Sequence, residues 1–559
     1  MKLKEAKKLF EKGLEKFINK EFESSIVFFE SSLKLAPNRS STLKNLVVSY
    51  LSINNLAKAE EHLKSLIINN GKEKDIIPLI NKVFRDTDNI RNFIKFINSI
   101  KNENINPIFK ILKDLSIPKI FENKNEIKVF RENLEKKLDS YINSNFKNEF
   151  NIEKEQLNPP IFSLSYDEFN NKKIFTKVVN VFRKIYPQLN YSKKKFRKNS
   201  DKIKIGFISQ FFSDHTIGKL FKGIIFNLDN NKFDINIFHT QQTNKTGIFN
   251  EIINHEKKSN IKNFILPNNF HLGIKTIENN NLDLIFYPDI GMSKELYFYT
   301  FLKLAKYQIT SWGHPETTGN HTIDYFLSSK LMETKSAQIN YSEKLLLSNY
   351  LPMYLYKPVI KNKLSDDDLV SENIYSCPQT LVKIHPDFDL IVDKILKQDR
   401  KAKIYFMKDT EDLLYKKLLN RFKTTISSDL NRIIFLDRMS VNDYINHCGK
   451  SSVLLDPIYF GAGNSFHESM YYGTPTISNP TNYMKSRIVL GGYKQMKIEN
   501  PPITKTVDEY IYQAVELANN KKKNLEIKKY FRDSAEKYLF ENKEFIKELE
   551  DILIKIALQ

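Results

Sequence analysis

Residues 456–475 have the sequence DPIYFGAGNSFHESMYYGTP, around which the fold of the C-terminal half can be predicted. The apolar run SVLL at 452–455 precedes it and predicts the end of a buried strand. After a glycine loop, a helical pattern runs from about Ser465 to Tyr472 and ends at a Gly-Thr-Pro sequence. A strand, a glycine loop and a helix N-terminus together predict an anion site, because free backbone N–H groups and the positive end of the helix dipole face the ligand.

Glu468 lies three residues into this predicted helix, and two interpretations of it stay open. Its carboxylate is close enough to the predicted anion site to accept hydrogen bonds from sugar hydroxyls. Alternatively, it closes a capping box with Ser465 as the N-cap, which satisfies the helix's own N–H groups and needs no ligand. The rest of the chain has to decide between them.

Length and composition limit the number of domains and the kinds of partner that the protein can have. The 559 residues exceed one hydrophobic core and predict three or four domains. The 87 Lys and Arg outnumber the 66 Asp and Glu, and the net charge of +21 predicts acidic partners such as nucleotide phosphates, nucleic acid or anionic lipid. A compositional bias of the whole chain towards Lys, Asn and Ile is the alternative explanation. The basic residues are scattered and match no RNA-binding or DNA-binding motif, so we expect no nucleic-acid partner.

The cellular compartment is predicted from cysteine use and from apolar runs. Cys377 and Cys448 are the only cysteines, which excludes a disulfide framework and fits a reducing compartment. The N-terminal sequence MKLKEAKKLFEKGLEKF is charged and lacks the apolar core of a signal peptide. No apolar run approaches the ~20 residues that a membrane-spanning helix needs. We therefore expect a cytoplasmic protein without a membrane span.

Residues 1–72 carry an internal repeat. Ser25 and Ala59 are 34 residues apart, as are Phe29 and Leu63. Small residues at helix contacts and large ones between them, at this period, are typical of tetratricopeptide repeats. Each unit is a helix pair that buries its apolar face only by stacking on a neighbour. Such stacks bind polypeptides, and oligomerisation through this region is possible.

Residues 73–200 keep a helical spacing of apolar residues but lose the repeat. The spacing recurs in IIPLINKVF, IRNFIKFINSI, EIKVFRENLEKKLDSYI and FTKVVNVFRKIYPQL, and prolines separate these segments. We expect a helical domain or linker here. The basic sequence YSKKKFRKNSDK at 191–202 predicts the boundary to the next domain.

From residue 201 to 355 the pattern changes to alternating strands and helices. The strand-like runs are KIKIGFIS, FDINIFHT, NFILP, LDLIFYPDI, YQITSWG and IDYFLSS. This alternation predicts a doubly wound parallel sheet, which binds ligands at the carboxyl ends of its strands. His215 lies in the loop after the first strand, and SWGHPETTG at 311–319 forms a second strand-end loop. Without other evidence, a lone loop histidine is best interpreted as structural.

A second alternating series occupies 356–559, with the strand-like runs NIYSCP, AKIYFMK, RIIFLD and SVLLDP. Lys383 follows a strand-end turn and can reach a diphosphate; a surface helix lysine is the alternative. Asp387 and Asp389 resemble a metal pair, but their place in the first turn of a helix favours stabilisation of its dipole. We therefore expect no metal site.

Two Rossmann-like lobes in series, with a phosphate-type loop only in the second, predict the GT-B fold of nucleotide-sugar transferases. An all-α tetratricopeptide-like domain would precede them. The nucleotide sugar would bind mainly to the second lobe, and the acceptor would enter between the lobes. The chain has no GxxxxGK followed by Ser or Thr, and no GxGxxG opens a helix after a strand. The sequence therefore supports neither a P-loop nucleotidase nor a dinucleotide oxidoreductase.

Several segments, in a fixed order over 202–490, are KIGFISQFFSDHTIGKL, SWGHPETTG with TIDYFLSS, YSEKLLLSNYLP, CPQTLVKIHPDFD, RIIFLDRMS and DPIYFGAGNSFHESMYYGTP. On these segments the chain resembles the O-linked N-acetylglucosamine transferase family, in particular its bacterial SPINDLY-type members. The helical sequences IPKIFENKNEIKVFRENLEKKL and PPIFSLSYDEFNNKKIF resemble the same bacterial members. The resemblance is weakest over the first hundred residues.

The resemblance implies roles for individual residues. His215 matches the family's active-site histidine, and Lys383 matches the lysine that contacts the donor's diphosphate. Asn464 and Ser465 stand where the family usually has a hydroxyl pair on the phosphates, and the amide of Asn464 can also donate. Glu468 stands where the family has an acidic residue on the ribose.

The remaining implied contacts concern the base and the sugar. Met439 would offer backbone groups to the base, and Tyr444 would stack on it. His314 replaces a common tyrosine, which allows a different sugar pocket. The implied sugar and acceptor pocket comprises His314, Pro315, Thr317 and Thr318.

The implied reaction is a direct displacement at the sugar's anomeric carbon, with inversion. Lys383, the backbone amides from Gly463 to Ser465 and the helix dipole would stabilise the leaving diphosphate without a metal or other cofactor. The acceptor hydroxyl needs a base, for which His215 and a phosphate oxygen of the donor are the candidates.

The leading expectation is transfer of N-acetylglucosamine from UDP-N-acetylglucosamine to Ser or Thr hydroxyls of a polypeptide. Related enzymes use GDP-fucose, or transfer glucose from UDP-glucose to asparagine, and the sequence does not separate these. A non-catalytic repeat scaffold with inactive lobes is the alternative from a different class of protein. The presence of His215, Lys383 and Glu468 together argues against a scaffold.

Overall fold

The structure is a computed structural model that describes residues 2–70, 75–100, 105–144, 150–193, 196, 201–256, 261–370, 372–409 and 413–559. The chain divides into two compact units. The first unit comprises Met1–Lys119 and Asn145–Pro160, and the second comprises Ile120–Ser144 and Ile161–Gln559. Both parallel sheets belong to the second unit.

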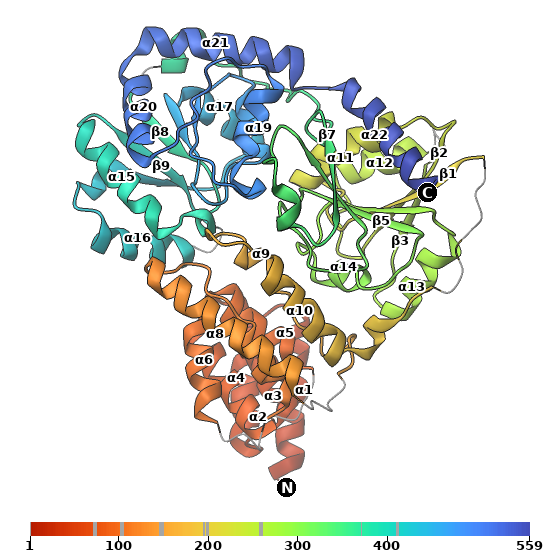
Figure 1. Ribbon diagram of the computed structural model, residues 1–559. Helices are drawn as coiled ribbons and strands as arrows, with labels where there is room; N and C mark the ends of the chain where they lie inside the picture. The colour runs from red at the N-terminus through yellow and green to blue at the C-terminus, as the bar shows by residue number, and fades with distance from the viewer. Residues whose placement is uncertain are drawn as a thin grey trace. The chain divides into compact units, whose positions relative to one another are not determined.

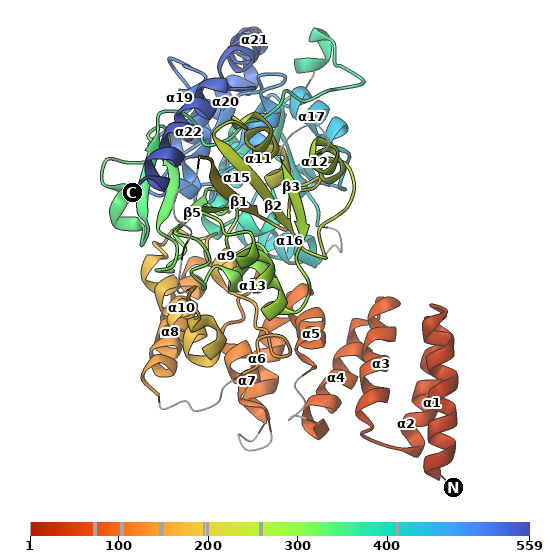
Figure 2. The same ribbon diagram turned by 90° about the vertical axis from the view of Figure 1, so that its right-hand side faces the viewer.

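The first unit is built from helices. They are α1 (Lys2–Ile18), α2 (Phe22–Leu35), α3 (Ser40–Ser52), α4 (Leu56–Asn70), α5 (Ile77–Ile80), the π-helical turn η1 (Asn81–Asp86), α6 (Ile90–Ser99) and α7 (Pro107–Asp114). Helix α1 packs against α2, and α3 packs against α4, so both helix pairs expected from the repeat are present (Figure 2). Gly13 allows the close approach of the first pair, because a Cβ there would lie 2.7 Å from the Phe29 ring. The hydroxyls of Ser25 and Ser49 hydrogen-bond at 3.1 Å between the pairs.

The second unit begins with helices that precede the sheets. They are α8 (Lys124–Asn143), α9 (Ile161–Leu164), α10 (Lys172–Ile185) and the 3-10 turn η3 (Pro187–Asn190). Lys177 of α10 pairs with Glu135 and Asp139 of α8. The predicted helical region 73–200 is therefore divided between the two units. Half of the basic linker predicted at 191–202 lies outside the described residues.

In the first lobe, the described residues form a seven-stranded parallel sheet in the order β3-β2-β1-β4-β5-β6-β7. The strands are β1 (Ile203–Ile208), β2 (Phe233–His239), β3 (Lys262–Ile265), β4 (Leu284–Tyr287), β5 (Tyr307–Ser311), β6 (Tyr325–Ser329) and β7 (Lys344–Ser348). The connecting helices are α11 (Thr216–Asn227), α12 (Ile248–Glu256), α13 (Phe270–Asn279) and α14 (Lys294–Tyr299), with the 3-10 turn η4 (Ala337–Asn340) before β7 (Figure 1). The strand order reverses between β1 and β4, so the loops after these strands border the crevice where such sheets bind ligands.

The second lobe repeats this plan with a five-stranded parallel sheet in the order β10-β9-β8-β11-β12. The strands are β8 (Ile374–Cys377), β9 (Lys403–Met407), β10 (Ile433–Leu436), β11 (Val453–Leu455) and β12 (Thr476–Ile477). The helices are α15 (Pro386–Gln398), α16 (Leu413–Thr425), α17 (Val441–Lys450), α18 (Asn464–Ser469) and α19 (Ile488–Gln495), with 3-10 turns η5 (Asp366–Val370), η6 (Leu381–Lys383), η7 (Leu430–Arg432) and η8 (Met484–Ser486). Here the order reverses between β8 and β11, so the loops that follow these two strands meet.

Helix α18 is shorter than the helix predicted at 465–472. Gly463 is its N-cap in place of Ser465, and no side chain caps it, so the capping box with Glu468 is absent. The helix stops before Gly473, which has a φ of +70°. A Cβ at Gly473 would lie 2.0 Å from a backbone carbonyl oxygen, so this turn requires glycine.

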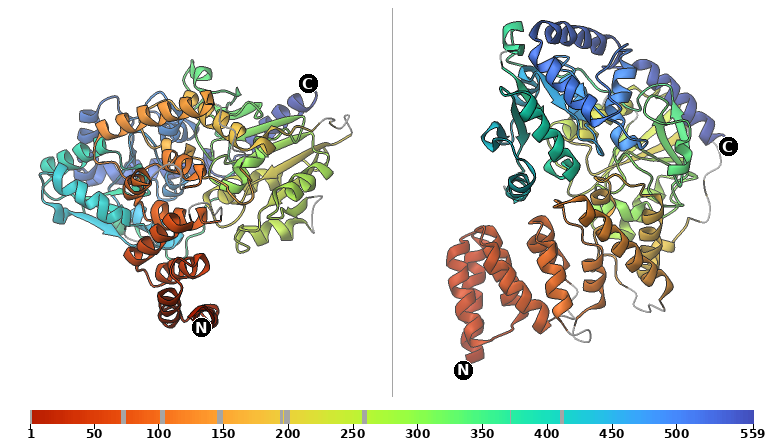
Figure 3. Two further views of the ribbon diagram at one scale, coloured as in Figure 1. Left: turned by 90° about the horizontal axis from the view of Figure 1, so that it is seen from below. Right: turned by 60° about the vertical axis from the view of Figure 1, so that its left-hand side comes forward.

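The chain ends in α20 (Val507–Asn519), α21 (Lys521–Tyr538) and α22 (Lys543–Ala557). Helix α20 packs on β8 and β11, whereas α22 crosses to the first lobe and packs on β7 (Figure 3). Glu548 of α22 accepts a hydrogen bond from the Ser348 hydroxyl, and Glu550 pairs with Lys232 at 2.8 Å. The last helix of the predicted second lobe, 356–559, thus helps to cover the first.

One apolar core continues from the first lobe into α18 and α19. Phe207 and Phe286 of the first sheet and Phe466 of α18 belong to the same buried cluster. Phe466 is fully buried against Tyr493 of α19, and burying such a side chain contributes about 1.5–3 kcal/mol. This burial fixes the orientation of α18 beside the first lobe. Within the described ranges, no helix is both long enough and apolar enough to cross a membrane.

Arg421 is almost completely buried in the second lobe, with 1% of its surface exposed. Its guanidinium donates to both carboxylate oxygens of Asp389, at 2.8 and 2.9 Å, and to the backbone carbonyls of Phe121 and Ile384. Asp389 is therefore the partner of a buried arginine, which corrects the expectation that it mainly stabilises a helix dipole. Nε, Nη1 and Nη2 of Arg421 each donate a hydrogen bond to an oxygen. A buried charge needs such partners.

We expect Arg421→Met to lower the free energy of unfolding by about 3–5 kcal/mol, because the Asp389 carboxylate stays buried without its partner. Denaturant unfolding followed by circular dichroism measures the change. Lys394→Met is the matched control: it breaks a pair with Asp508, whose side chain is 83% exposed, and should cost at most about 1 kcal/mol. Equal losses in the two variants would contradict the structural importance of the buried pair.

Candidate active site

Lys383 lies at the point of the second lobe where the strand order reverses, in turn η6 after β8. Its Nζ donates to Gln379 Oε1 and to the Gly461 carbonyl, both at 2.9 Å, and lies 4.8 Å from the centroid of the Phe460 ring. The loops after β8 and β11 are thus joined by this ammonium group. Burial lowers the pKa of Lys383 to about 8, although the nearby Asp456 opposes the shift. The side chain therefore remains mainly charged at pH 7.

Gln379 connects Lys383 to the predicted phosphate loop. While its Oε1 accepts from Lys383, its Nε2 donates to Ser465 Oγ at 2.6 Å. Gln379 is buried, and it had no predicted role; its place at a strand end was the only signal in the sequence. Asn464, also buried, has a side-chain oxygen without a hydrogen-bond partner in the described part of the chain. These groups form a polar cluster where the loops after β8 and β11 meet.

Asp456 shapes the glycine loop that follows β11. Its carboxylate accepts from the Ala462 amide at 2.6 Å and from the Ser478 hydroxyl at 2.5 Å. Burial raises the pKa of Asp456 to about 7. The amide of Gly461 donates to the Lys485 carbonyl, whereas the amides at 463–465 donate no hydrogen bond within the described residues. The backbone donors predicted for the anion site are therefore still available.

Glu468 faces the first lobe. Its carboxylate accepts from Nζ of Lys219, on α11, at 2.6 Å. Tyr444 of α17 lies close by: burial and the charges of Cys448 and Glu468 hold the pKa of its hydroxyl well above the ordinary value. Lys383, Gly463, Asn464, Ser465, Glu468 and Tyr444 are thus brought together. Met439 stands in the loop before α17, and its predicted contact with the base stays a prediction.

His215 is the N-cap of α11. Its Nδ1 accepts a hydrogen bond from the Ile217 amide at 3.2 Å, and its ring stacks on Phe211 with centroids 4.4 Å apart. Burial, together with Lys219, lowers the pKa of His215 to about 4, so the ring is neutral at pH 7. Because Nδ1 accepts, the single proton of the neutral ring sits on Nε2. In this tautomer, Nε2 of His215 is a hydrogen-bond donor and cannot act as an acceptor.

The loop 311–319 is held from within the protein. His314 Nε2 hydrogen-bonds Ser165 Oγ at 2.7 Å, and burial lowers the pKa of His314 to about 3. The hydroxyls of Thr317 and Thr318 both donate to the buried carboxylate of Glu343. The two threonines fix the loop, because a buried carboxylate needs donors; their implied place in a sugar and acceptor pocket stays a prediction.

Residues 161–171, from the predicted helical region, form a wall that sequence patterns did not assign to the site. Phe162 lies 5.0 Å from the ring of His314, and Tyr166 lies 5.0 Å from the ring of Phe460, measured between ring centroids. An aromatic surface therefore runs from the His314 loop of the first lobe to the glycine loop of the second. The only signal in the sequence was the segment PPIFSLSYDEFNNKKIF.

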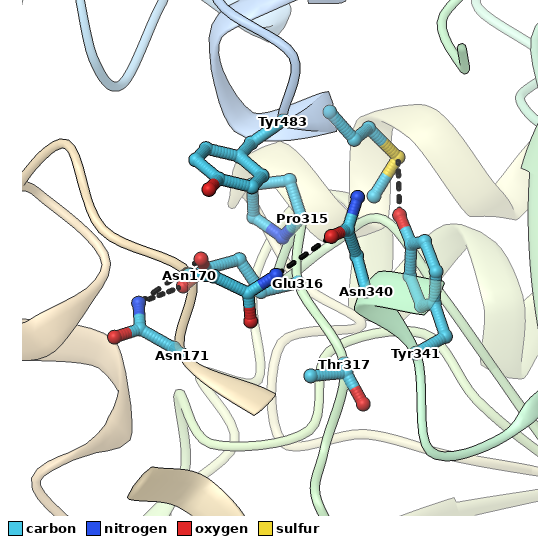
Figure 4. A pocket seen from close by; sticks show the side chains of 9 residues that line it. Asn170, Asn171, Pro315, Glu316, Thr317, Asn340, Tyr341 and Tyr483 are labelled. Atoms are coloured by element: carbon cyan, nitrogen blue, oxygen red, sulfur yellow. Dashed lines mark hydrogen bonds between the residues drawn. The ribbon is translucent and has the colours of Figure 1, made fainter. Parts of the chain in front are cut away.

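A small pocket opens next to this wall (Figure 4). It is lined by Asn170, Asn171, Pro315, Glu316, Thr317, Asn340, Tyr341, Tyr483 and Met484. Asn171 donates to both oxygens of Glu316, and Lys485 of the second lobe pairs with the same carboxylate at 3.0 Å. Pro315 and Thr317 therefore do line a pocket, formed by the helical segment and both lobes.

In the first lobe, the strand order reverses between β1 and β4, and a buried carboxyl group lies at this point. It was not predicted as functional. Asp289 follows β4 beside Ser209, which follows β1, and 6% of its surface is exposed. Burial raises the pKa of Asp289 to about 8, so the group is mainly protonated at pH 7. Among the described residues, no three His, Cys, Asp or Glu side chains group as metal ligands, and metal independence stays a prediction.

The chain is similar in sequence to two curated protein glycosyltransferases. It is 23% identical over 262 residues to the UDP-glucose:protein N-beta-glucosyltransferase of Actinobacillus pleuropneumoniae serotype 7 (strain AP76), covering 45% of the chain and 41% of that protein. It is 24% identical over 371 residues to the probable UDP-N-acetylglucosamine–peptide N-acetylglucosaminyltransferase SEC of Arabidopsis thaliana, covering 64% of the chain and 37% of that protein. The chain thus spans less than half the length of these curated relatives. No protein-family profile matches it.

The fold extends the similarity to the whole chain. A mutant of the O-GlcNAc transferase of Thermobaculum terrenum matches with a TM-score of 0.71 at 14% identity, covering 100% of this chain and 98% of that one. The helical N-terminal region followed by two Rossmann-like lobes is therefore the GT-B arrangement expected from the sequence. The chain is thus similar in sequence to protein glycosyltransferases and shares its fold with a bacterial O-GlcNAc transferase.

Proposed function

We propose that this protein is a glycosyltransferase that moves a sugar from a nucleotide sugar to a polypeptide side chain. The observation that carries the proposal is the meeting of Lys383, Gln379 and Ser465 where the strand order of the second lobe reverses. This is the place where doubly wound sheets bind nucleotides. The buried ammonium group and the free amides at 463–465 suit a diphosphate. Both curated relatives are named as protein glycosyltransferases.

The proposed step is an inverting displacement. The acceptor atom forms a bond to the anomeric carbon on the face opposite the diphosphate, while the bond from that carbon to the diphosphate oxygen breaks and its electron pair leaves with the diphosphate. Lys383 and the amides at 463–465 offset the charge that develops on the leaving group. Removing one such donor typically costs about 10²–10³-fold in rate.

The proton of the acceptor goes, in this proposal, to a phosphate oxygen of the donor. His215 is not the base, because Nδ1 accepts from the Ile217 amide and Nε2 carries the proton. The Nε2–H group instead donates a hydrogen bond to the reacting groups. A neutral donor suits this position, since the lowered pKa of His215, about 4, keeps the ring uncharged at pH 7.

For the donor we propose a UDP-sugar, because both relatives are named for one. N-acetylglucosamine transfer to Ser or Thr hydroxyls is our first proposal and agrees with the name of the Arabidopsis relative. Glucose transfer to asparagine is the second candidate, favoured by the Actinobacillus relative. The two free, buried cysteines fit the reducing cytoplasm that we propose as the compartment.

Calorimetric titration with UDP and with GDP tests the donor site directly. We expect binding of UDP in preference to GDP; preferential binding of GDP would point to a GDP-sugar such as GDP-fucose. Binding of neither nucleotide would mean that the lobes are inactive, as in a repeat scaffold. A panel of UDP-N-acetylglucosamine, UDP-glucose and GDP-fucose, with mass spectrometry of co-expressed proteins, then identifies the sugar and the modified residue.

Lys383→Ala should reduce transfer by at least about 10²-fold, because the leaving diphosphate loses its ammonium partner. The rate of UDP release from the nucleotide sugar in the presence of acceptor measures the loss. Lys397→Ala is the control, since Lys397 has the same charge, has a side chain that is 56% exposed, and pairs with Asp393 within α15. Near-normal turnover by Lys383→Ala, with circular dichroism unchanged, would contradict the proposed role.

The affinity for UDP should fall as the pH rises through about 8, the pKa of Lys383 in the free protein. Below this pH the ammonium form predominates and attracts the diphosphate; above it, affinity should decline by up to about tenfold per pH unit. Calorimetry from pH 7 to 9.5 measures the profile. In Lys383→Arg, whose guanidinium stays charged, the decline should disappear; the same slope in both proteins would exclude Lys383 as its source.

Two substitutions of His215 distinguish a hydrogen-bond donor from a general base at this position. His215→Ala should lower transfer by about 10²-fold and leave UDP affinity unchanged, because it removes the Nε2–H group. His215→Gln should keep most of the activity, since an amide N–H can donate in its place but cannot take up a proton. Equal losses in the two variants would show instead that His215 acts as the base.

A further inference from the structure

An ion pair joins the two lobes across the crevice. Nζ of Lys219, on α11 of the first lobe, lies 2.6 Å from Oε1 of Glu468, on α18 of the second. The pair is shielded from water, with 26% of the Lys219 side chain and 9% of the Glu468 side chain exposed. Neither sequence patterns nor the resemblance gave Lys219 a role.

Lys219 lies one helical turn after His215, and both side chains are therefore on the same face of α11. Glu468 is placed in the same way, three residues after Ser465 on α18. The ion pair therefore places the face of α11 that carries His215 and Lys219 beside the face of α18 that carries Ser465 and Glu468.

The charges of this crevice explain why a lysine is needed there. The leaving diphosphate is an anion, and the carboxylate of Glu468 is an anion close to the amides predicted to bind it. Lys383 supplies one positive charge, which Asp456 partly opposes. Without Lys219, a shielded carboxylate would stand unpaired beside the diphosphate and would repel it. With Lys219, the carboxylate is neutralised and fixed in one orientation.

We propose that Lys219 is a positioning residue for the nucleotide sugar: it neutralises Glu468 and holds it for the donor, an inference that rests on the proposed function. The second lobe binds the nucleotide, and Lys219 makes this binding depend on the first lobe. Glu468 can use its second oxygen for a sugar hydroxyl while the first stays bound to Lys219, because a carboxylate has about four acceptor positions.

Calorimetric titration with UDP on four proteins tests this inference: the wild type, Lys219→Met, Glu468→Gln and the double variant. We expect Lys219→Met to weaken UDP binding about tenfold or more, because the carboxylate is left unpaired. In the double variant the glutamine carries no charge, so affinity should return to that of Glu468→Gln alone. Lys219→Arg, which keeps the charge, should stay within about threefold of the wild type.

Lys222→Met is the matched control, because Lys222 is on the same helix and pairs with Glu251 at 2.6 Å. It removes the same charge from α11 and should leave UDP affinity within about twofold. Transfer assays add a second readout: Lys219→Met should raise KM for the nucleotide sugar more than it lowers kcat. If Lys219→Met loses its fold, the double variant and Lys219→Arg, which contain no unpaired carboxylate, still decide the question.

The outcomes separate this inference from the proposed function. A wild type that binds neither UDP nor GDP overturns the proposed function and this inference with it. A wild type that binds UDP while Lys219→Met binds it equally well overturns the role of Lys219 alone. Losses that simply add in the double variant would also overturn it, because they would show that Lys219 does not act through Glu468.

Discussion

The site depends on one constraint, the burial of the Lys383 ammonium group where two strand-end loops meet. A parallel sheet in the order β10-β9-β8-β11-β12 brings the loops after β8 and β11 together, whatever their sequences. A cation in such a place needs oxygen partners, which Gln379 and the Gly461 carbonyl supply. Gln379 accepts a hydrogen bond from Lys383 and donates one to Ser465 at the start of α18. These two hydrogen bonds link the position of α18 to the charged lysine.

The crevice is closed by chain that lies outside the two sheets. Residues 161–171 bring Phe162 and Tyr166 between the His314 loop and the glycine loop. Lys485 of the second lobe pairs with Glu316 of the first in a buried contact, and α22 returns to cover the first sheet. An acceptor polypeptide would therefore meet a surface to which the helical segment contributes as much as either lobe does.

The fold could be predicted well from the sequence, and the site only in part. Apolar runs located the strands other than β7 and β12, because both faces of a strand in a parallel sheet are buried and its sequence is therefore almost continuously apolar. The roles of Thr317 and Thr318 could not be found in this way, since their partner Glu343 lies 26 and 25 residues away. Gln379, Tyr166 and Lys219 were missed for the same reason: each acts through a contact between elements that no local period records.

Burial moves the titratable groups of the crevice towards their neutral forms. It lowers the pKa of Lys383 to about 8 and that of His215 to about 4, and it raises the pKa of Asp289 to about 8 and that of Asp456 to about 7. The crevice thus holds little net charge of its own, and desolvation strengthens whatever charge remains. In the proposed reaction, an entering diphosphate would favour the ammonium form of Lys383 and so restore the charge that burial disfavours. Lys383 would then be most strongly cationic when the leaving group is most strongly anionic, which is the condition for stabilising a transition state more than a ground state.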